Sequence, residues 1–280
     1  MDEGGRKQQR RVAVVMACHN RRDTTVACLR ALHEQQVDRV HLSVFVTDDG
    51  STDGTADAIR CVWPGATVIS GSGNLFWAAG MALAEQAALA AGPDYLLWLN
   101  DDTNLDPGGL QTLLKTSAAN PGAIVVGATR DPESGVQTYG GRVRVDYHPQ
   151  RFRLLPISAS PQRANTFHGN VVLIPVSVCD RVGRIDGAFP HAYADDDYGL
   201  RATALGVPVI QAPGAVATCR TNDSLLPLTS MGWAAKWRHL QSPKGLPWRA
   251  QARYLRRHGD WRWPLLLLAG QVRRAAGRRP

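Results

Sequence analysis

The sequence predicts an α/β protein with a mostly parallel central sheet flanked by helices, followed by a basic helical C-terminal extension. Between residues 12 and 211, short apolar segments of strand length alternate with helical segments, which is the pattern of strand-helix-strand units. Two of the apolar segments end directly in paired carboxylates, at residues 48–49 and 101–102. Residues 236–280 hold twelve Lys and Arg but only one acidic residue, so their local net charge of +11 exceeds the net charge of +8 of the whole chain. The basic character therefore belongs to the C-terminal part of the chain.

The composition is that of an ordinary globular protein. A chain of 280 residues, 44% hydrophobic and 20% charged, can bury a full core. Its five cysteines form an odd set without a C-x-x-C pair, so neither a disulfide framework nor a cysteine zinc site is predicted. A reducing, cytoplasmic environment fits this cysteine usage. Residues 1–11 lack the apolar core of a signal peptide and are predicted to be disordered, and residues 264–270 are too short to cross a bilayer.

The first half of the fold is predicted from residues 12–105. Apolar runs predict four strands, at residues 12–16, 42–46, 66–69 and 95–99. The turn over residues 47–55 is rich in Asp, Gly, Ser and Thr, which cap the following helix. The predicted helices between these strands are one with apolar positions at Val26, Leu29 and Leu32, one at residues 56–61, and an Ala-rich one at residues 79–91.

The second half is predicted from residues 106–225. Its elements are a helix at 106–119, a strand at 123–127, a strand at 171–174, a short helix at 178–182, a helix through the acidic residues 195–197 to Leu205, and a strand at 207–211. Residues 130–162 look irregular, with one strand at 142–145. The boundary near residue 225 depends on the change in charge and Trp content alone.

Paired carboxylates at strand ends predict a cation site. Asp101 and Asp102 follow the apolar strand 95–99. Burying a carboxylate costs much free energy unless a cation or strong hydrogen-bond donors contact it. Parallel strands would bring Asp48 and Asp49 to the same edge of the sheet. A hard cation such as Mg²⁺ or Mn²⁺ is commonly held by one or two carboxylates plus substrate phosphates, and would neutralise charge on a diphosphate leaving group. A carboxylate of the third cluster, residues 195–197, could then accept a proton from an attacking hydroxyl.

Several motifs occur in a fixed order along the chain. The most distinctive string is D-D-G-S-T-D-G-T at residues 48–55. The other motifs are C-H-N-R at 18–21, G-N-L-F-W at 73–77, L-N-D-D-T at 99–103, H-G-N at 168–170 and D-D-D-Y-G-L-R at 195–201. With these motifs the chain resembles family 2 glycosyltransferases of the GT-A fold from about residue 12 to 222, and more narrowly bacterial rhamnosyl- and galactofuranosyl-transferase-like members.

The resemblance implies an inverting transferase with a GT-A nucleotide-diphospho-sugar transferase fold. Residues 12–105 would bind a nucleoside-diphosphate sugar, and residues 106–225 would bind the acceptor and carry catalysis. Asp195 falls at the general-base position, and Asp102, with Asp101, at the metal-binding position for Mg²⁺ or Mn²⁺. The implied donor-binding residues are Asn20, Asp48, Asp49, Asn74, Trp77, Asn100 and Asp101. The implied acceptor-binding residues are His168, Gly169, Asn170 and Asp196.

The sequence departs from the family pattern at three positions. Asn100 replaces the first acid of the D-x-D motif, Ala194 stands where many relatives have Glu, and Cys219 falls about where others have a metal-binding His. Trp77 is predicted either to form the floor of a sugar pocket or to pack in the core. Arg201 is expected to be a structural partner of Asp197.

The implied role is hexosyl or deoxyhexosyl transfer in the synthesis of a cell-surface glycan or glycoconjugate. The acceptor class stays open between a glycan, a lipid-linked molecule and a small molecule. The basic tail, residues 226–280, is open to two interpretations: a solvated helical face, or a surface for anionic lipid at the inner face of the membrane. Its tryptophans favour a membrane interface, and no nucleic-acid motif accompanies them. The tryptophans are Trp233, Trp237, Trp248, Trp261 and Trp263.

The sequence leaves two alternative functions open, and features of the chain count against each. A sugar-nucleotide nucleotidyltransferase usually carries a Gly-rich triphosphate loop after its first strand, and residues 17–22 lack those glycines. An inactive membrane-surface adaptor of the same fold is disfavoured because Asp102 and Asp195 are both present.

Overall fold

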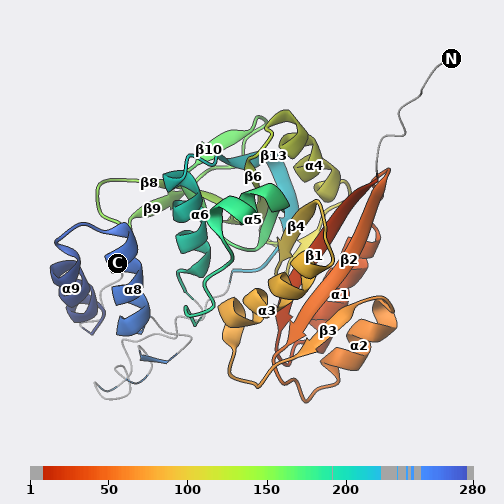
Figure 1. The fold of residues 1–280 in the computed structure, drawn as a ribbon, viewed down its shortest axis with the longest axis horizontal. Helices are drawn as coiled ribbons and strands as arrows, with labels where there is room; N and C mark the ends of the chain where they lie inside the picture. The colour runs from red at the N-terminus through yellow and green to blue at the C-terminus, as the bar shows by residue number, and fades with distance from the viewer. Residues whose placement is uncertain are drawn as a thin grey trace.

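The computed structural model describes residues 9–190, 192–221 and 247–275, together with residues 232, 238, 241 and 242. These residues form a central sheet between two layers of helices (Figure 1). The elements of the first half are β1 (Arg10–Cys18), α1 (Arg22–His33), β2 (Val40–Asp48), α2 (Thr55–Val62), β3 (Thr67–Ser70), α3 (Phe76–Ala90), β4 (Tyr95–Leu99) and β5 (Asn104–Leu105). Those that follow are α4 (Gly109–Ala119), β6 (Ile124–Arg130), β7 (Gln137–Tyr139), β8 (Gly141–Arg144), β9 (Phe152–Leu154), β10 (Gln162–Ala164), β11 (Thr166–Phe167), β12 (Val171–Pro175), α5 (Val176–Val182), α6 (Ala194–Ala204), β13 (Val209–Thr218), α8 (Trp248–His258) and α9 (Trp263–Ala275).

One sheet runs through both predicted halves, in the order β10-β13-β6-β12-β4-β1-β2-β3. The strands β3, β2, β1 and β4 are parallel, and β13 is parallel to β6. This confirms the predicted α/β fold with a central, mostly parallel sheet. Strand β12 departs from that direction, because it is antiparallel to both β4 and β6. Its first residue, Val171, therefore lies opposite Leu99, the last residue of β4.

The helices of the two layers pack against opposite faces of the strands, whose side chains alternate with a period of two. In β1, Ala13 and Val15 belong to the cluster that also holds residues of α3, α5 and α6. Val12 and Val14 belong to the cluster that holds residues of α1, α2 and α4. The strands are buried on both faces, which is why their sequences are continuously apolar.

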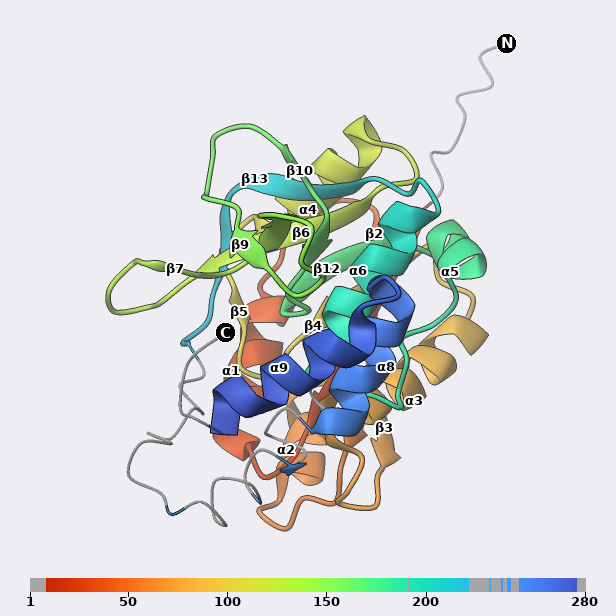
Figure 2. The same cartoon turned by 90° about the vertical axis from the view of Figure 1, so that its left-hand side faces the viewer.

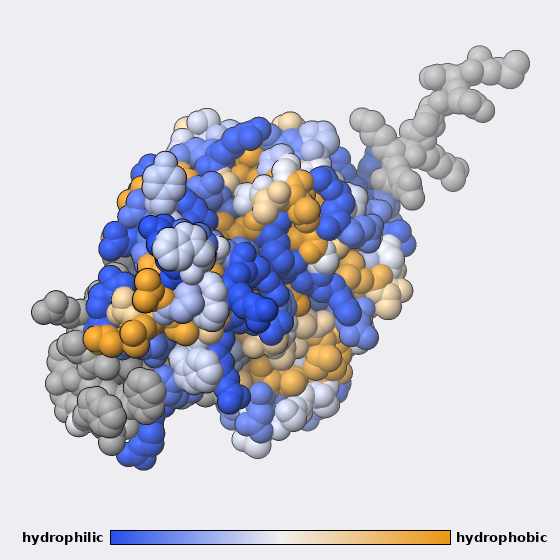
Figure 3. Space-filling view, turned by 60° about the vertical axis from the view of Figure 1, so that its left-hand side comes forward, coloured by the Kyte–Doolittle hydropathy of each residue, from blue (hydrophilic) through white to orange (hydrophobic). Residues whose placement is uncertain are grey.

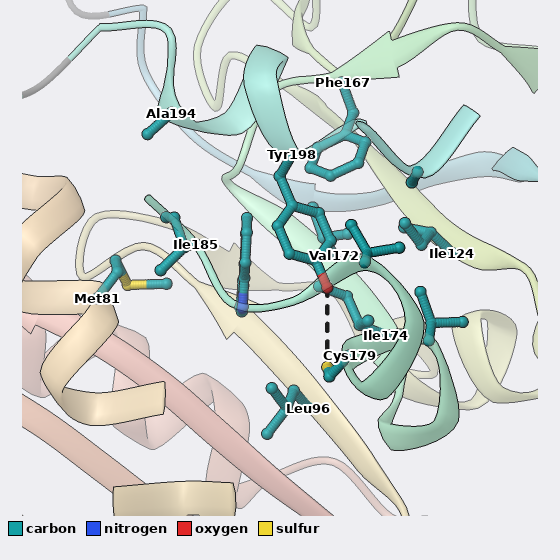
Figure 4. Packing of buried hydrophobic residues seen from close by; sticks show 14 of the residues in the cluster. Met81, Leu96, Ile124, Phe167, Val172, Ile174, Cys179, Ile185, Ala194 and Tyr198 are labelled. Atoms are coloured by element: carbon teal, nitrogen blue, oxygen red, sulfur yellow. Dashed lines mark hydrogen bonds between the residues drawn. The ribbon is translucent and has the colours of Figure 1, made fainter. Parts of the chain in front are cut away.

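Helix α6 is anchored in the core by Tyr198. The Tyr198 ring is fully buried beside Phe167 and Val172, and its hydroxyl donates to the Cys179 sulfur at 3.8 Å (Figure 4). The Trp98 ring of β4 meets it edge-on, with 4.9 Å between ring centroids. This packing fixes the helix whose first turn carries the third acidic cluster.

The C-terminal helices pack against the body of the protein. Figure 2 shows α8 beside α6, with α9 packed on α8. Tyr254 of α8 is fully buried, stacks on Tyr193 at 4.8 Å between centroids, and donates to the Pro149 carbonyl oxygen at 2.9 Å. The tail is thus helical where the structure describes it, whereas Trp233 and Trp237 lie outside the described residues. None of the described helices is both long enough and apolar enough to cross a membrane.

Several predicted element ends shift. The helix predicted from residue 106 begins at Gly109, because residues 104–105 pair with β13 as a short strand. The strand predicted over 207–211 continues to Thr218 through two register shifts. In the irregular region 130–162, β7 pairs with the neighbouring β6 and β9 with the neighbouring β8, whereas β10 pairs with the distant β13. The predicted disordered N-terminus falls partly outside the described residues, and β1 begins at Arg10 within its range.

Candidate active site

The carboxyl ends of the parallel strands bring two acidic pairs to one edge of the sheet. Cys18, at the end of β1, is in register with Asp48 at the end of β2. Strand β4 runs parallel to β1 on its other side and ends at Leu99, directly before Asn100. Ligands of open α/β sheets bind beyond such strand ends. The predicted clustering of the acidic pairs on one edge is therefore observed.

Asp101 and Asp102 are bridged by one arginine. Arg21 Nη1 donates to Asp101 Oδ1 at 2.9 Å and to Asp102 Oδ2 at 2.8 Å. Asp101 is 5% exposed, and burial raises its pKa to about 6 against the opposing effect of Arg21. The guanidinium thus supplies a positive charge where two carboxylates enter a largely buried position.

Cys219 and Asn170 lie on the far side of Asp102. Thr218 of β13 pairs with Asn104, so the chain continues into Cys219 close to the end of β4. The Cys219 sulfur is 3.6 Å from Asp102 Oδ1 and accepts from Asn170 Nδ2 at 3.6 Å. Burial raises the pKa of Cys219 to about 12, so the thiol is neutral. A neutral thiol is a poor ligand for a hard cation.

The carboxylates fit the implied Mg²⁺ or Mn²⁺ when substrate oxygens complete its coordination. Within the described ranges, no group of three or more His, Cys, Asp or Glu side chains is arranged to hold a metal. Asp101 and Asp102 offer two carboxylates, and the buried Asp101 Oδ2 has no hydrogen-bond partner among the described residues. Because Mg²⁺ is commonly held by one or two carboxylates plus substrate phosphates, this pair fits a cation that binds with a diphosphate.

Asp49 holds the loop that precedes α3. Its carboxylate accepts backbone N–H groups from Gly73 at 2.7 Å, Leu75 at 2.8 Å and Phe76 at 3.0 Å. The neighbouring Asp48 accepts the Ser51 N–H at 3.1 Å. Both aspartates are nearly buried, at 5% and 6% exposure. Asp49 therefore shapes the β3–α3 loop from within.

Asn20 ties the β1–α1 loop to the loop after β2. Its side-chain oxygen accepts the Thr52 N–H at 2.8 Å, and its own N–H donates to Ser51 Oγ at 2.8 Å. Asn20 has a φ of 50°, a left-handed conformation that asparagine tolerates better than most residues. Asn74 lies exposed on the β3–α3 loop. These two predicted donor residues thus sit on neighbouring loops at the same edge.

Trp77 connects the acidic pair of β4 with the segment before β12. Its indole Nε1 donates to Asn100 Oδ1 at 2.8 Å. At Gly169, a Cβ would come within 2.7 Å of Trp77 Cη2 and within 3.4 Å of Asp195 Cβ. Only glycine fits between these two side chains without displacement. Trp77 is also half-buried against the core beside Trp98, as the core interpretation predicts, whereas its place in a sugar pocket stays a prediction.

Asp195 lies half-buried at the start of α6. Its Oδ2 accepts the Gly169 N–H at 3.0 Å, and its Oδ1 accepts the Asp196 N–H at 2.9 Å. Asp195 thus lies in the first turn of α6, where the positive end of the helix dipole faces a negatively charged side chain. Tyr193, just before the helix, has a φ of 77°. This strained position sets the entry of α6 beside the 168–170 segment.

The other two aspartates of the cluster point into the protein. Asp196 accepts Arg142 Nη1 at 2.7 and 2.6 Å, and burial raises its pKa to about 7 against the effect of Arg142. Asp197 is fully buried and accepts Arg201 at 2.8 Å, as expected from the sequence. Arg257 and His258 of α8 also reach it, at 2.7 and 2.8 Å. Burial acts to raise the pKa of Asp197, but hydrogen bonds from His258, Arg201 and Arg257 outweigh it and hold the pKa below its usual range.

His168 is a neutral imidazole beside Tyr139. Burial lowers its pKa to about 3. Its ring meets Tyr139 edge-on at 5.3 Å between centroids, and its buried Nδ1 has no partner in the part of the chain that the structure describes. The structure thus brings the predicted residues at the end of β4, in the 168–170 segment and at the start of α6 close together. The side chains of Asn170 and Asp196 face protein partners.

Sequence reasoning assigned no role to three residues that shape this site. Arg21 stands in the C-H-N-R motif, yet its contact with Asp101 and Asp102 spans eighty residues. Arg142 and Arg257 come from the irregular region and the tail, where no local pattern points to an aspartate partner. The basic charge of the tail was the one available signal, and it was interpreted as a surface property.

Comparisons with known proteins agree on fold and family. The family model described as Glycosyl transferase family 2 matches residues 13–180, more than half of the chain. No curated protein matches the sequence. A crystal structure of TarS from S. aureus is similar with a TM-score of 0.57 at 13% identity, over 90% of this chain and 72% of that chain. The mannosyltransferase PcManGT from Pyrobaculum calidifontis, solved with GDP-Man and Mn²⁺, is similar with a TM-score of 0.50 at 21% identity, over 98% and 78%.

At 13% and 21% identity, the two solved structures support the fold alone. The family match covers β1 to β12 and the acidic loops between them. The resemblance inferred from the motifs is confirmed. The family favours sugar transfer over the nucleotidyltransferase alternative. The chain therefore belongs to glycosyl transferase family 2 and is a glycosyltransferase with the GT-A fold.

Proposed function

We propose that this enzyme moves a sugar from a nucleoside-diphosphate donor to an acceptor hydroxyl with inversion, using Asp195 as general base. The observation that carries the proposal is the contact chain from Asp195 through Gly169 and Trp77 to Asn100, which joins the base to the Asp101/Asp102 pair. Asp195 and the Asp101/Asp102 pair would lie on either side of the Trp77 indole. Such an arrangement of a base and a leaving-group site suits a single displacement at the anomeric carbon.

The reaction requires one proton transfer and one exchange of bonds. The acceptor oxygen forms a bond to the anomeric carbon while the bond from that carbon to the diphosphate oxygen breaks, and Asp195 takes the hydroxyl proton. Mg²⁺ or Mn²⁺, when bound, neutralises charge on the departing diphosphate as a Lewis acid. Asp102 and Asp101 would hold it. The backbone N–H groups of Gly169 and Asp196 orient the Asp195 carboxylate for the proton transfer.

The donor side is proposed to lie over the ends of β1, β2 and β4. Asp48 and Asp49 would face the base and ribose, with Asn20 and Asn74 on the adjoining loops. Because the Asp49 carboxylate already accepts three backbone N–H groups, we expect it to act by holding the β3–α3 loop in shape. Trp77, Asn100 and Asp101 would lie nearest to the sugar and the diphosphate.

The acceptor side is proposed to lie at residues 168–170 and the first turn of α6. His168 would line this surface as a neutral imidazole beside Tyr139. Gly169 lets the Trp77 ring pack close to the base. Asn170 and Asp196 would support this surface through Cys219 and Arg142. The acceptor would belong to a cell-surface glycan or glycoconjugate.

Release of nucleoside diphosphate tests this function. Purified enzyme with Mn²⁺ or Mg²⁺ is incubated with a panel of sugar nucleotides that includes GDP-mannose, because PcManGT was solved with that donor. A lipid extract and soluble glycans serve as acceptor sources. We expect one donor to give acceptor-dependent release. No release from any donor under any of these conditions would contradict the proposal.

We also propose that the tail docks on an anionic membrane surface. Trp261, Leu265, Leu268 and Val272 recur at helical spacing and are 83%, 64%, 64% and 59% exposed. Apolar residues gather on this side of the molecule (Figure 3). The chain around them is strongly basic, and interfacial helices combine such an apolar face with Lys and Arg.

Surface substitutions test docking better than deletion of the tail, because α8 contributes to the core. Leu265→Ser with Leu268→Ser should lower binding to phosphatidylglycerol vesicles at least tenfold, since each leucine loses about 1.5–3 kcal/mol of burial. The matched control is Val136→Ser with Leu205→Ser, at 65% and 51% exposure elsewhere on the surface. Equal vesicle binding by both double variants would refute docking through α9.

A further inference from the structure

The cation that contacts the Asp101/Asp102 pair in this structure is Arg21. A single nitrogen, Nη1, donates to one oxygen of each carboxylate, at 2.9 and 2.8 Å. We propose that Arg21 and a divalent cation compete for these two carboxylates, so that the donor-free enzyme binds metal weakly and takes it up together with the donor diphosphate. The inference depends on the proposed function only for the position of the metal.

The burial of the carboxylates makes this competition strong. The side chains of Asp101 and Asp102 are 7% and 15% exposed, so little water screens the charges around them. The guanidinium already neutralises one of the two negative charges. A metal ion on the same carboxylates would lie within a few ångströms of that guanidinium and would be repelled by it.

The surrounding residues offer a metal few other ligands. The Asn100 side-chain oxygen already accepts the Trp77 indole N–H, and the Cys219 sulfur is a soft ligand that already accepts from Asn170 Nδ2 at 3.6 Å. A hard cation that prefers six oxygens therefore gains at most the two carboxylates from this cluster. A diphosphate adds both the missing oxygens and at least two negative charges. With it present, the site can hold the metal and the guanidinium together.

The Arg21 side chain can leave the two carboxylates without disturbing the fold. Its side chain is 40% exposed, and among the described residues its guanidinium makes hydrogen bonds only to Asp101 and Asp102. It directly precedes α1, so its backbone is held while the side chain extends from the helix start. Release therefore breaks two hydrogen bonds and requires no movement of the sheet.

Metal binding to the donor-free protein tests the competition. Mn²⁺ affinity is measured by electron paramagnetic resonance on the full chain without nucleotide, for the wild type, Arg21→Gln and Arg22→Gln. Arg22 is the matched control, because it is the next residue and pairs with the exposed Asp23. We expect Arg21→Gln to bind Mn²⁺ at least tenfold more tightly than the wild type, and Arg22→Gln to match the wild type. Adding Asp102→Asn to Arg21→Gln should abolish the gain.

An Mn²⁺ dissociation constant for Arg21→Gln within twofold of the wild-type value would overturn the inference. The inference would also be overturned if neither protein bound Mn²⁺ at millimolar concentrations. If circular dichroism shows that Arg21→Gln is unfolded, Arg21→Met keeps most of the side-chain stem and is judged by the same criterion. Since no donor is present, the result is separate from turnover. Failure of the proposed function would appear as absent nucleoside diphosphate release, with the Mn²⁺ difference between the variants intact.

Discussion

The backbone N–H of Gly169 donates to the Asp195 carboxylate at 3.0 Å, across twenty-six residues of sequence. The same glycine faces the Trp77 ring, where a Cβ would come within 2.7 and 2.8 Å of two ring carbons. Base, glycine and indole are thus packed in one contact row. The position of the proposed base depends on the smallest side chain in that row.

Gly169→Ala should therefore impair turnover more than folding. The added methyl group must displace either the Trp77 ring or Asp195, and such overpacking costs about 1–3 kcal/mol. We expect kcat to fall at least tenfold, measured as nucleoside diphosphate release with the donor that the panel assay selects. Gly65→Ala is the control, because a Cβ there has no neighbour within 4 Å. Equal kcat for the two variants would show that this packing does not position the base.

Asp195→Asn should remove the proton acceptor while keeping the shape of the side chain. Loss of a general base typically lowers the rate by about 10²–10⁴-fold. We expect that loss in kcat, with the affinity for nucleoside diphosphate unchanged in calorimetric titration. Asp180→Asn, on the exposed side of α5, serves as control and should retain full turnover. Normal turnover of Asp195→Asn would exclude Asp195 as the base.

Glu85 should make stability depend on pH. It is fully buried in α3, and burial raises its pKa to about 7 against the opposing effects of the Ile185 backbone and Arg184. The folded protein therefore holds a proton that the unfolded chain, with a pKa near 4.5, releases. This contribution to stability is complete below about pH 4.5 and is lost as the pH rises through 7, by about 3 kcal/mol in all.

Urea unfolding of the wild type and Glu85→Gln between pH 5 and 8 measures this effect. Because Gln stays neutral, the difference in unfolding free energy should move in favour of Glu85→Gln as the pH rises. Other titrating groups are common to both proteins and cancel in the difference. A difference that stays constant across this range would contradict a raised pKa for Glu85.

Asp197 should be important for the stability of the whole enzyme. It is fully buried and pairs with Arg201 of its own helix and with Arg257 of α8. Removing one partner of a buried ion pair typically costs about 3–5 kcal/mol. Asp197→Asn should lower the unfolding free energy by that order, measured by urea titration at pH 7. Asp57→Asn, whose carboxylate is 88% exposed in its pair with Arg60, should cost about 1 kcal/mol or less.

The interpretation of the tail changed most between sequence and structure. Its charge predicted a surface for membranes, and the exposed face of α9 is consistent with that proposal. Yet Arg257 and His258 turn inward to Asp197, two residues from the proposed base. A cluster of basic residues gives no sign of which members face water, because that depends on how α8 lies against α6. The tail is part of the catalytic fold as well as its surface.

The sequence by itself determined the fold class, the family and the location of the acidic loops. Those features depend on local patterns: apolar runs of strand length, turn residues at their ends, and motifs in a fixed order. The tertiary structure alone decided that Arg21 bridges Asp101 and Asp102, that β12 runs antiparallel and carries Gly169 to Trp77, and that Asp197 takes its partner from α8. Each of these contacts joins residues far apart in the chain. Strand order, strand direction and helix packing set them, and these are properties of the whole fold that no local stretch of sequence records.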